Sequence, residues 1–244
     1  MRLRLIACEI MFREACLCAA NSRNIVDVQF MPKGLHDLET HEMVARLQRE
    51  IDDAPPDLYE GVLLGYALCN NGIVGLTARH CPLIVPRAHD CITLFLGSRE
   101  RYNQYFSERP GTFFKTTGWC ERDFLTVPDT ITEKMGLKKT YEEYVAQYGE
   151  ENAKYLMEQM GGWKQSYNTM AFIDMGIGDF LGYEQEAEKE AEENGWELLK
   201  LKGDLRLIRR LLDGEWDDEE FLVLQPGESV IASNDERIIA ARTP

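Results

Sequence analysis

The stretch RLRLIACEIMFREACLCAANSRNIVDVQFM, residues 2–31, contains the pattern that decides the fold. The apolar run RLRLIAC predicts a buried strand, MFREACLCAANS predicts a short helix, and NIVDVQFM predicts a second strand. Strands that alternate with helices are typical of a parallel sheet, because a parallel strand pair needs a crossover connection that is usually a helix. The beginning of the chain is therefore predicted to be α/β.

The same alternation continues outward from this stretch. HEMVARLQREIDD (residues 41–53) has the periodicity of an amphipathic helix, and GVLLGYALC (61–69) and PLIVP (82–86) predict buried strands. GIVGLTAR (72–79) predicts a helix, and ITLFLGSRERYNQYF (92–106) predicts a helix that is broken or recapped at its Gly-Ser pair. The pattern predicts a doubly wound, mainly parallel sheet.

The chain divides into three parts on this evidence. Residues 1–120 form the predicted N-terminal α/β half, and residues 121–167, rich in Tyr, Glu, Lys and Met, form a predicted helical bridge. Residues 168–244 form a second α/β half, in which TMAFIDMG, WELLKLKG and EEFLVLQPG are expected strands and the last of them ends the pattern. Two glycine-terminated helices are expected between these strands, at DFLGYEQEAEKEAEENG and LRLIRRLLDG.

Composition excludes some function classes. The 244 residues carry a formal net charge of -15, which repels nucleic acid and an anionic membrane surface. No apolar segment is long enough to cross a bilayer, so we expect a soluble, cytoplasmic protein. The seven cysteines are an odd number without the spacing of a disulfide framework, so reduced thiols are expected.

Three of these cysteines stand where a predicted strand runs out: Cys8, Cys69 and Cys91. The carboxyl ends of parallel strands share one edge of a sheet, where ligands usually bind, so the three thiols are expected to converge. Thiolates suit zinc, iron, nickel or copper far better than magnesium or calcium. The alternative is that each cysteine is a small apolar core residue, which is common.

A closed tetrahedral site needs a fourth ligand, and His89 is the nearest candidate in the sequence. Asp90 or Glu9 offers an oxygen or a hydrogen bond to a ligand, and Cys120 is a spare thiol. If no side chain takes the fourth position, it stays open to water or substrate. Three thiolates with an open position also fit an iron–sulfur cluster.

The segment GYALCNNGIVGL invites a different interpretation. Asn70, Asn71 and Gly72 precede the helix predicted at residues 72–79, and a helix N-terminus can bind an anion. The segment has neither the G-x-G-x-x-G spacing nor the lysine of a P-loop.

The segments GYALCNNGIVGL, HDCITLFLGSRERY and PGTFFKTTGW resemble the characteristic stretches of an uncharacterised domain family of anaerobic bacteria and methanogenic archaea. That family has no established activity, and its members are often encoded near corrinoid-dependent methyltransferases, which implies one-carbon or cobalamin-related metabolism and a corrinoid or methyltransferase protein as a partner. The resemblance extends over most of the chain. Family motifs contain Gly65, Cys69, Gly72, Cys91, Gly97, Ser98, Arg99, Gly111 and Trp119.

Two main functions are expected from these observations. The first is a metal-binding carrier, store or accessory factor that holds its ion or iron–sulfur cluster with Cys8, Cys69 and Cys91, assisted by His89. The second is an enzyme that acts on a small one-carbon or sulfur-containing substrate through an open metal position or a thiolate. A nucleotide-binding regulator that uses the glycine loop is a third interpretation, and homo-oligomer formation stays open.

Overall fold

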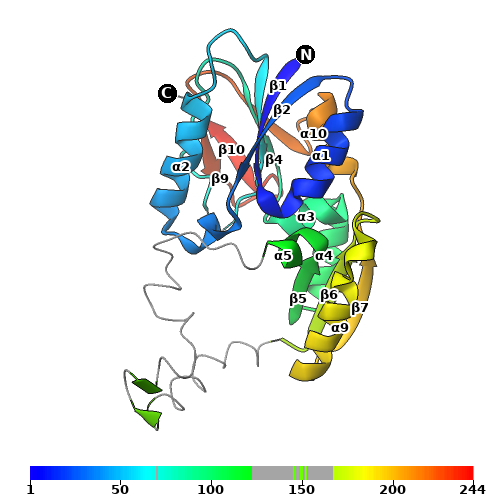
Figure 1. Ribbon diagram of the computed structural model, residues 1–244. Coiled ribbons are helices and arrows are strands. Elements are labelled where there is room, and N and C mark those ends of the chain that lie inside the picture. The colour runs from blue at the N-terminus through cyan, green and yellow to red at the C-terminus, as the bar shows by residue number, and fades with distance from the viewer. Residues whose placement is uncertain (70, 123–144, 147–148, 151, 153–166, 244) are drawn as a thin grey trace.

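The computed structural model contains a five-stranded, mainly parallel sheet, a three-stranded parallel sheet and a two-stranded antiparallel sheet (Figure 1). It describes residues 1–69, 71–122, 145–146, 149–150, 152 and 167–243. Among these residues, no helix combines the length and the apolar character that a membrane crossing requires.

The first sheet has the strand order β2-β1-β3-β4-β8. Its first four strands are parallel, and the fifth pairs with β4 in the antiparallel direction. β1 aligns Cys8 with Met31 of β2, and Ala7 with Gly65 of β3, so these three strands end close to one edge. The strands are β1 (Arg2–Cys8), β2 (Ile25–Met31), β3 (Gly61–Gly65), β4 (Leu83–Pro86) and β8 (Phe221–Leu224).

Helices cover both faces of this sheet (Figure 1). α1 (Phe12–Asn21) and α10 (Arg206–Asp213) pack against each other on one face, and α2 (Thr40–Asp52) covers the other. The apolar stripes predicted for these helices supply the contact: Met43, Leu47 and Ile51 of α2 are all buried. The expected doubly wound, mainly parallel α/β fold is confirmed.

The second sheet has the order β5-β6-β7 and is entirely parallel. It consists of β5 (Thr112–Thr116), β6 (Thr169–Asp174) and β7 (Glu197–Lys202), with α9 (Tyr183–Asn194) packed on β6 and β7. Both predicted strands of this sheet and the helix that ends at Gly195 are confirmed. β5 was not expected from the sequence, because its five residues carry little apolar periodicity.

Two short helices, α3 (Cys91–Leu96) and α4 (Arg99–Glu108), connect β4 of the first sheet to β5 of the second, and a third, α5 (Thr117–Glu121), follows β5. α3 ends at Gly97, which adopts φ +73°. Ser98 caps the start of α4, because its hydroxyl accepts a hydrogen bond from the backbone N–H of Arg101 at 3.1 Å. The predicted recapping at Gly97 and Ser98 is confirmed.

Three expectations need correction or fall outside the structure. Residues 72–79 form turns and one β-bridge from Thr77 to Ser229 instead of a helix, because Ile73 and Leu76 are buried by tertiary packing. The strand in EEFLVLQPG is not the last, since β9 (Ser229–Ala232) and β10 (Ile239–Arg242) follow it as an antiparallel pair. The predicted helical bridge at 121–167 lies largely outside the described residues.

One side chain in the interior, Glu14 on α1, has no compensating partner. It is fully buried, and neither carboxylate oxygen has a hydrogen-bond partner among the described residues. The neighbouring Arg13 guanidinium is held by Glu121 through hydrogen bonds of 2.9 and 2.6 Å, so it offsets little of the cost. Burial raises the pKa of Glu14 from 4.5 to about 7.

This raised pKa predicts a pH dependence of stability. The folded state holds the Glu14 proton more tightly than the unfolded chain, so its contribution is complete below pH 4.5 and is lost as the pH rises to about 7. Glu14→Gln should remove this pH dependence. Between about pH 5 and about pH 8, the free energy of unfolding of the variant should rise relative to that of the wild type by about 2 kcal/mol, as measured by urea denaturation. The exposed Glu186→Gln on α9 is the control, and a parallel pH profile for wild type and Glu14→Gln would contradict the prediction.

Candidate thiol site at the carboxyl edge of the first sheet

Cys8 is the last residue of β1, as the sequence predicted. The chain turns directly into the short 3-10 helix η1 (Glu9–Met11), whose Ile10 backbone hydrogen-bonds the thiol, and Cys8 is 1% exposed. The pKa of Cys8 is raised to about 12, mainly by burial and to a smaller extent by electrostatic repulsion from Cys69 and Glu9. Cys8 is therefore a neutral thiol in the absence of a cation.

Cys69 does not stand at the end of a strand, because β3 ends four residues earlier at Gly65. The segment that follows β3 runs beside the segment that follows β4. The N–H groups of Leu68 and Cys69 donate to the carbonyl oxygens of Ala88 and His89, both at 2.9 Å. Cys69 also has φ +43°, a left-handed conformation that is rare for a residue with a Cβ. Such strain often occurs at functional sites.

Cys91 is the first residue of α3, and the helix cap fixes its position. The Asp90 carboxylate accepts hydrogen bonds from the backbone N–H of Ile92 at 3.0 Å and from the Tyr102 hydroxyl at 2.8 Å. Burial raises the pKa of Cys91 well above its usual value. Asp90 therefore has a structural role as an N-cap beside the thiol.

The three thiols lie within electrostatic range of one another. Cys69 raises the pKa of Cys8, and both of these thiols raise the pKa of Cys91, in each case after the larger effect of burial. The pKa of Cys69 itself is raised by burial to about 12. As they are placed, however, no three His, Cys, Asp or Glu side chains of the described residues have an arrangement that would hold a metal ion. The ligand set Cys8, Cys69, Cys91 and His89 stays a prediction.

The other candidate ligands differ in what they contact. His89 is exposed, and its ring stacks near that of Tyr102 with a centroid distance of 6.4 Å. The Glu9 carboxylate is already engaged, because it accepts a hydrogen bond from the Lys33 backbone N–H at 2.8 Å and lies 3.9 Å from Arg122.

The anion site predicted at Asn70, Asn71 and Gly72 depended on a helix at residues 72–79, which the structure does not contain. Residues 72–79 are not helical, so no helix N-terminus faces Asn71 and Gly72 in the described part of the chain. Gly72 has a packing reason to be glycine, since a Cβ there would lie 2.5 Å from the Met43 sulfur. Asn70 lies outside the described residues.

A cavity of about 870 Å³ opens beside the thiols. Cys69, Cys91, His89 and Asp90 form part of its wall. Aromatic rings form much of the rest, from Tyr102, Phe106, Trp119 and Tyr167. Its size suits a small organic molecule, and it brings such a molecule next to two of the three thiols.

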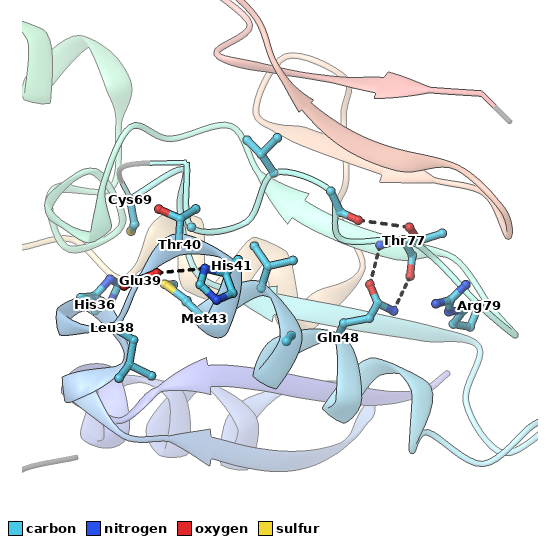
Figure 2. A pocket seen from close by; sticks show the side chains of 15 residues that line it. His36, Leu38, Glu39, Thr40, His41, Met43, Gln48, Cys69, Thr77 and Arg79 are labelled. Atoms are coloured by element: carbon cyan, nitrogen blue, oxygen red, sulfur yellow. Dashed lines mark hydrogen bonds and ion pairs between the residues drawn. The ribbon is translucent and has the colours of Figure 1, made fainter. Parts of the chain in front are cut away.

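A second cavity of about 1000 Å³ adjoins the first, because Cys69 and His36 line both (Figure 2). The first residues of α2 form one wall. Gln48 fixes the opposite wall by donating to the Thr77 carbonyl at 3.1 Å and accepting from the Thr77 N–H at 2.8 Å (Figure 2). Cys69 thus stands in the wall between two cavities.

One polar group at the site, the hydroxyl of Tyr66, was not predicted from the sequence. This hydroxyl lies beside the Cys8 thiol, and Tyr66 is 1% exposed. It makes no hydrogen bond of good geometry among the described residues. In the sequence, Tyr66 is one aromatic residue in an apolar run, so no local signal marks it. A buried hydroxyl without a partner is costly, which makes it available to a bound group.

A family described as "Protein of unknown function (DUF1638)" matches residues 30–212 of this chain. The chain belongs to the DUF1638 family. This confirms the predicted membership of an uncharacterised domain family, and it places Cys69 and Cys91 inside the matched range and Cys8 before it. No match was found among curated proteins or among solved structures.

Proposed function

We propose that this DUF1638 protein binds a thiophilic metal at the carboxyl edge of its first sheet. Cys8, Cys69 and Cys91 supply thiolates, His89 assists, and the bound species is zinc, iron, nickel or an iron–sulfur cluster. The observation that carries the proposal is that Cys8, Cys69 and Cys91, from three separate segments, lie close enough for Cys69 to raise the pKa of Cys8 and for both to raise the pKa of Cys91.

Two further features support this proposal. A cysteine side chain moves its sulfur by rotation about one bond, so metal binding requires new side-chain rotamers at the three cysteines. A cation also replaces the three thiol protons and offsets the cost of burying thiolate charge. The unpartnered Tyr66 hydroxyl offers a hydrogen bond to a sulfur atom or to a group on the metal.

The role we propose is that of a carrier, store or accessory factor in one-carbon or corrinoid metabolism, with a corrinoid or methyltransferase protein as partner. The alternative is an enzyme that acts on a small one-carbon or sulfur-containing substrate. The cavity of about 870 Å³ favours that alternative, because it gives a substrate room next to Cys69 and Cys91. A metal with four protein ligands would support a carrier, and an open position would support an enzyme.

Metal loading of protein purified without oxygen tests the proposal. We expect about one metal ion or cluster per chain, and a loss of affinity of at least about tenfold in Cys8→Ser and in Cys69→Ser, because each variant removes one thiolate ligand. Cobalt substitution followed by absorption spectroscopy should show thiolate-to-metal charge-transfer bands that weaken in both variants.

Cys81→Ser is the matched control. Cys81 is a half-buried free thiol that precedes β4, at the opposite end of that strand from Cys91. Its substitution should leave the metal content and the spectrum unchanged. Equal metal content in Cys69→Ser and Cys81→Ser would show that the thiols are core residues.

A further inference from the structure

A separate cavity of about 590 Å³ lies at the carboxyl end of β7 in the second sheet. Lys202, the last residue of β7, lines it together with Arg101 from α4 and Arg209 from α10. Ligands of open parallel sheets bind beyond the carboxyl ends of the strands, and this cavity occupies that position. It has no lining residue in common with the two cavities at the thiol site.

The three basic side chains at this cavity are not neutralised. Within the described part of the chain, Arg101, Lys202 and Arg209 take part in no ion pair. The surrounding protein carries 42 acidic against 27 basic residues, so acidic partners are plentiful. A cavity that keeps three cations unpaired in such a chain has a local charge opposite to that of the whole molecule.

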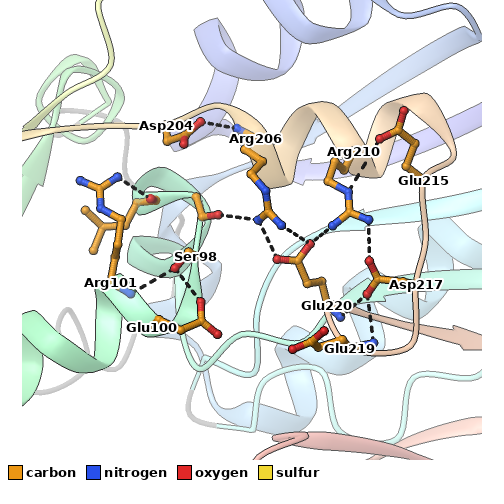
Figure 3. A network of polar contacts seen from close by, with 12 residues as sticks. Ser98, Glu100, Arg101, Asp204, Arg206, Arg210, Glu215, Asp217, Glu219 and Glu220 are labelled. Carbon is orange, nitrogen blue, oxygen red and sulfur yellow. Dashed lines mark hydrogen bonds and ion pairs between the residues drawn. The ribbon is translucent and has the colours of Figure 1, made fainter.

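The neighbouring arginines show what ordinary pairing looks like on this surface (Figure 3). Arg206 forms a bidentate pair with Glu220, with hydrogen bonds of 2.6 and 3.0 Å. Arg210 also pairs with Glu220 and with Asp217. These pairs belong to the same part of α10 as Arg209, so the absence of a carboxylate partner at Arg209 is a local property of the cavity.

Arg101 is held in position by neutral groups. Its guanidinium donates to the carbonyl oxygens of Leu96 at 2.8 Å and of Lys202 at 2.7 Å. These contacts orient the side chain without neutralising its charge, and a guanidinium has five N–H donors in total. A fixed arginine loses little further conformational freedom when an anion binds.

The one carboxylate at the cavity is engaged elsewhere. Asp204 accepts a hydrogen bond from the backbone N–H of Arg206 at 2.9 Å and so caps the start of α10. Gly203 keeps the end of β7 close to the loop after β6, since a Cβ there would lie 2.1 Å from the Met175 sulfur. The cavity wall is therefore closely packed where β7 ends and α10 begins, between Lys202 and Arg209.

We propose that this cavity binds a small molecule through an oxyanion group, either a phosphate or a carboxylate. Arg101 and Arg209 suit such a group because a guanidinium can donate two parallel hydrogen bonds to two oxygens, and Lys202 adds a point charge. The volume of about 590 Å³ accommodates a metabolite-sized ligand. The net charge of -15 disfavours a nucleic acid or an anionic membrane as the source of the oxyanion.

Calorimetric titration at low ionic strength tests this inference with inorganic phosphate, pyrophosphate and succinate as probes. We expect saturable binding of one equivalent, weakened at least about tenfold in the double variant Lys202→Ala/Arg209→Ala, since two charge-assisted contacts to the oxyanion are lost. Both side chains are exposed, so the fold should not depend on them. Tighter binding of a phosphate probe would identify a phosphate ligand, and tighter binding of succinate a carboxylate ligand.

Lys200→Ala is the matched control, because Lys200 lies on the same strand but pairs with Glu184. It should bind the probes as the wild type does. No saturable binding of any probe, or an equal loss in Lys200→Ala and in the double variant, would overturn the inference. Cys69→Ser should leave the titration unchanged, so the outcome is independent of the metal proposal.

Discussion

Arg87→Met is expected to lower the free energy of unfolding by about 3–5 kcal/mol, because it removes the central donor of a buried network. Arg87 follows β4, and its side chain is 2% exposed. The guanidinium donates to the carbonyl oxygens of Asp218 at 2.9 Å, Arg237 at 3.3 Å and Ile239, and it pairs with the Asp218 carboxylate at 2.8 Å. Methionine fills similar space but donates a hydrogen bond to none of these oxygens.

The loss of the Arg87 contacts should also destabilise the thiol site. Arg87 begins the segment that leads through His89 and Asp90 to Cys91, and its own N–H donates to the Glu220 carbonyl at 2.8 Å. Urea denaturation followed by circular dichroism measures the stability change. Arg237→Met is the control, because the Arg237–Asp218 pair is 62% and 67% exposed and should contribute less than about 1 kcal/mol. Equal effects of the two substitutions would contradict the prediction.

Local sequence patterns were sufficient for most of the two parallel sheets. The β1–α1–β2 unit follows from its change of periodicity, and α9 and α10 end at the glycines that predicted their ends. The turn segment at 72–79 was misassigned because Ile73 and Leu76 have the spacing of a helix. Their burial comes from packing against distant parts of the chain, which a local pattern does not contain.

Pairing between distant strands could not be predicted in this way. β8 joins the first sheet antiparallel to β4, and its register aligns Leu83 with Leu224, 141 positions apart in the printed numbering. Either edge of a parallel sheet offers free N–H and C=O groups to such a strand, and its own sequence does not state which edge it meets. The β9–β10 pair after it is short and carries weak alternation.

The candidate site shows the same division. All three cysteines were predicted at strand ends, and only Cys8 lies at one. Cys69 lies in a loop with a positive φ, and Cys91 is the first residue of α3, beyond the end of β4 at Pro86. Tyr66 and Tyr102 enter the site through tertiary contacts with Cys8 and Asp90, so no motif marks them. Residue type and chain position suggested the three candidate thiols, but the polar groups around them required the structure.

Among glycine-to-alanine substitutions in the described part of the chain, Gly118→Ala is expected to disturb the thiol site most. A Cβ at Gly118 would lie 1.7 Å from the Ile10 carbonyl oxygen and 2.7 Å from its carbon. Both atoms are backbone, so no side-chain rotation relieves the clash, and α5 must move away from η1. We expect a loss of more than about 3 kcal/mol in the free energy of unfolding.

The displacement has a direct consequence for function, because the Ile10 backbone of η1 hydrogen-bonds the Cys8 thiol and α5 carries Trp119, a wall of the cavity beside Cys69 and Cys91. Cys8 should therefore react faster with a thiol reagent in Gly118→Ala than in the wild type, under conditions where both are folded. Gly195→Ala is the control: its φ of +70° costs about 1 kcal/mol, but nothing lies within 4 Å of the added methyl group, and Cys8 should stay protected. Unchanged Cys8 protection in Gly118→Ala would mean that η1 is not held by α5, and the thiol site would then depend on the first sheet alone.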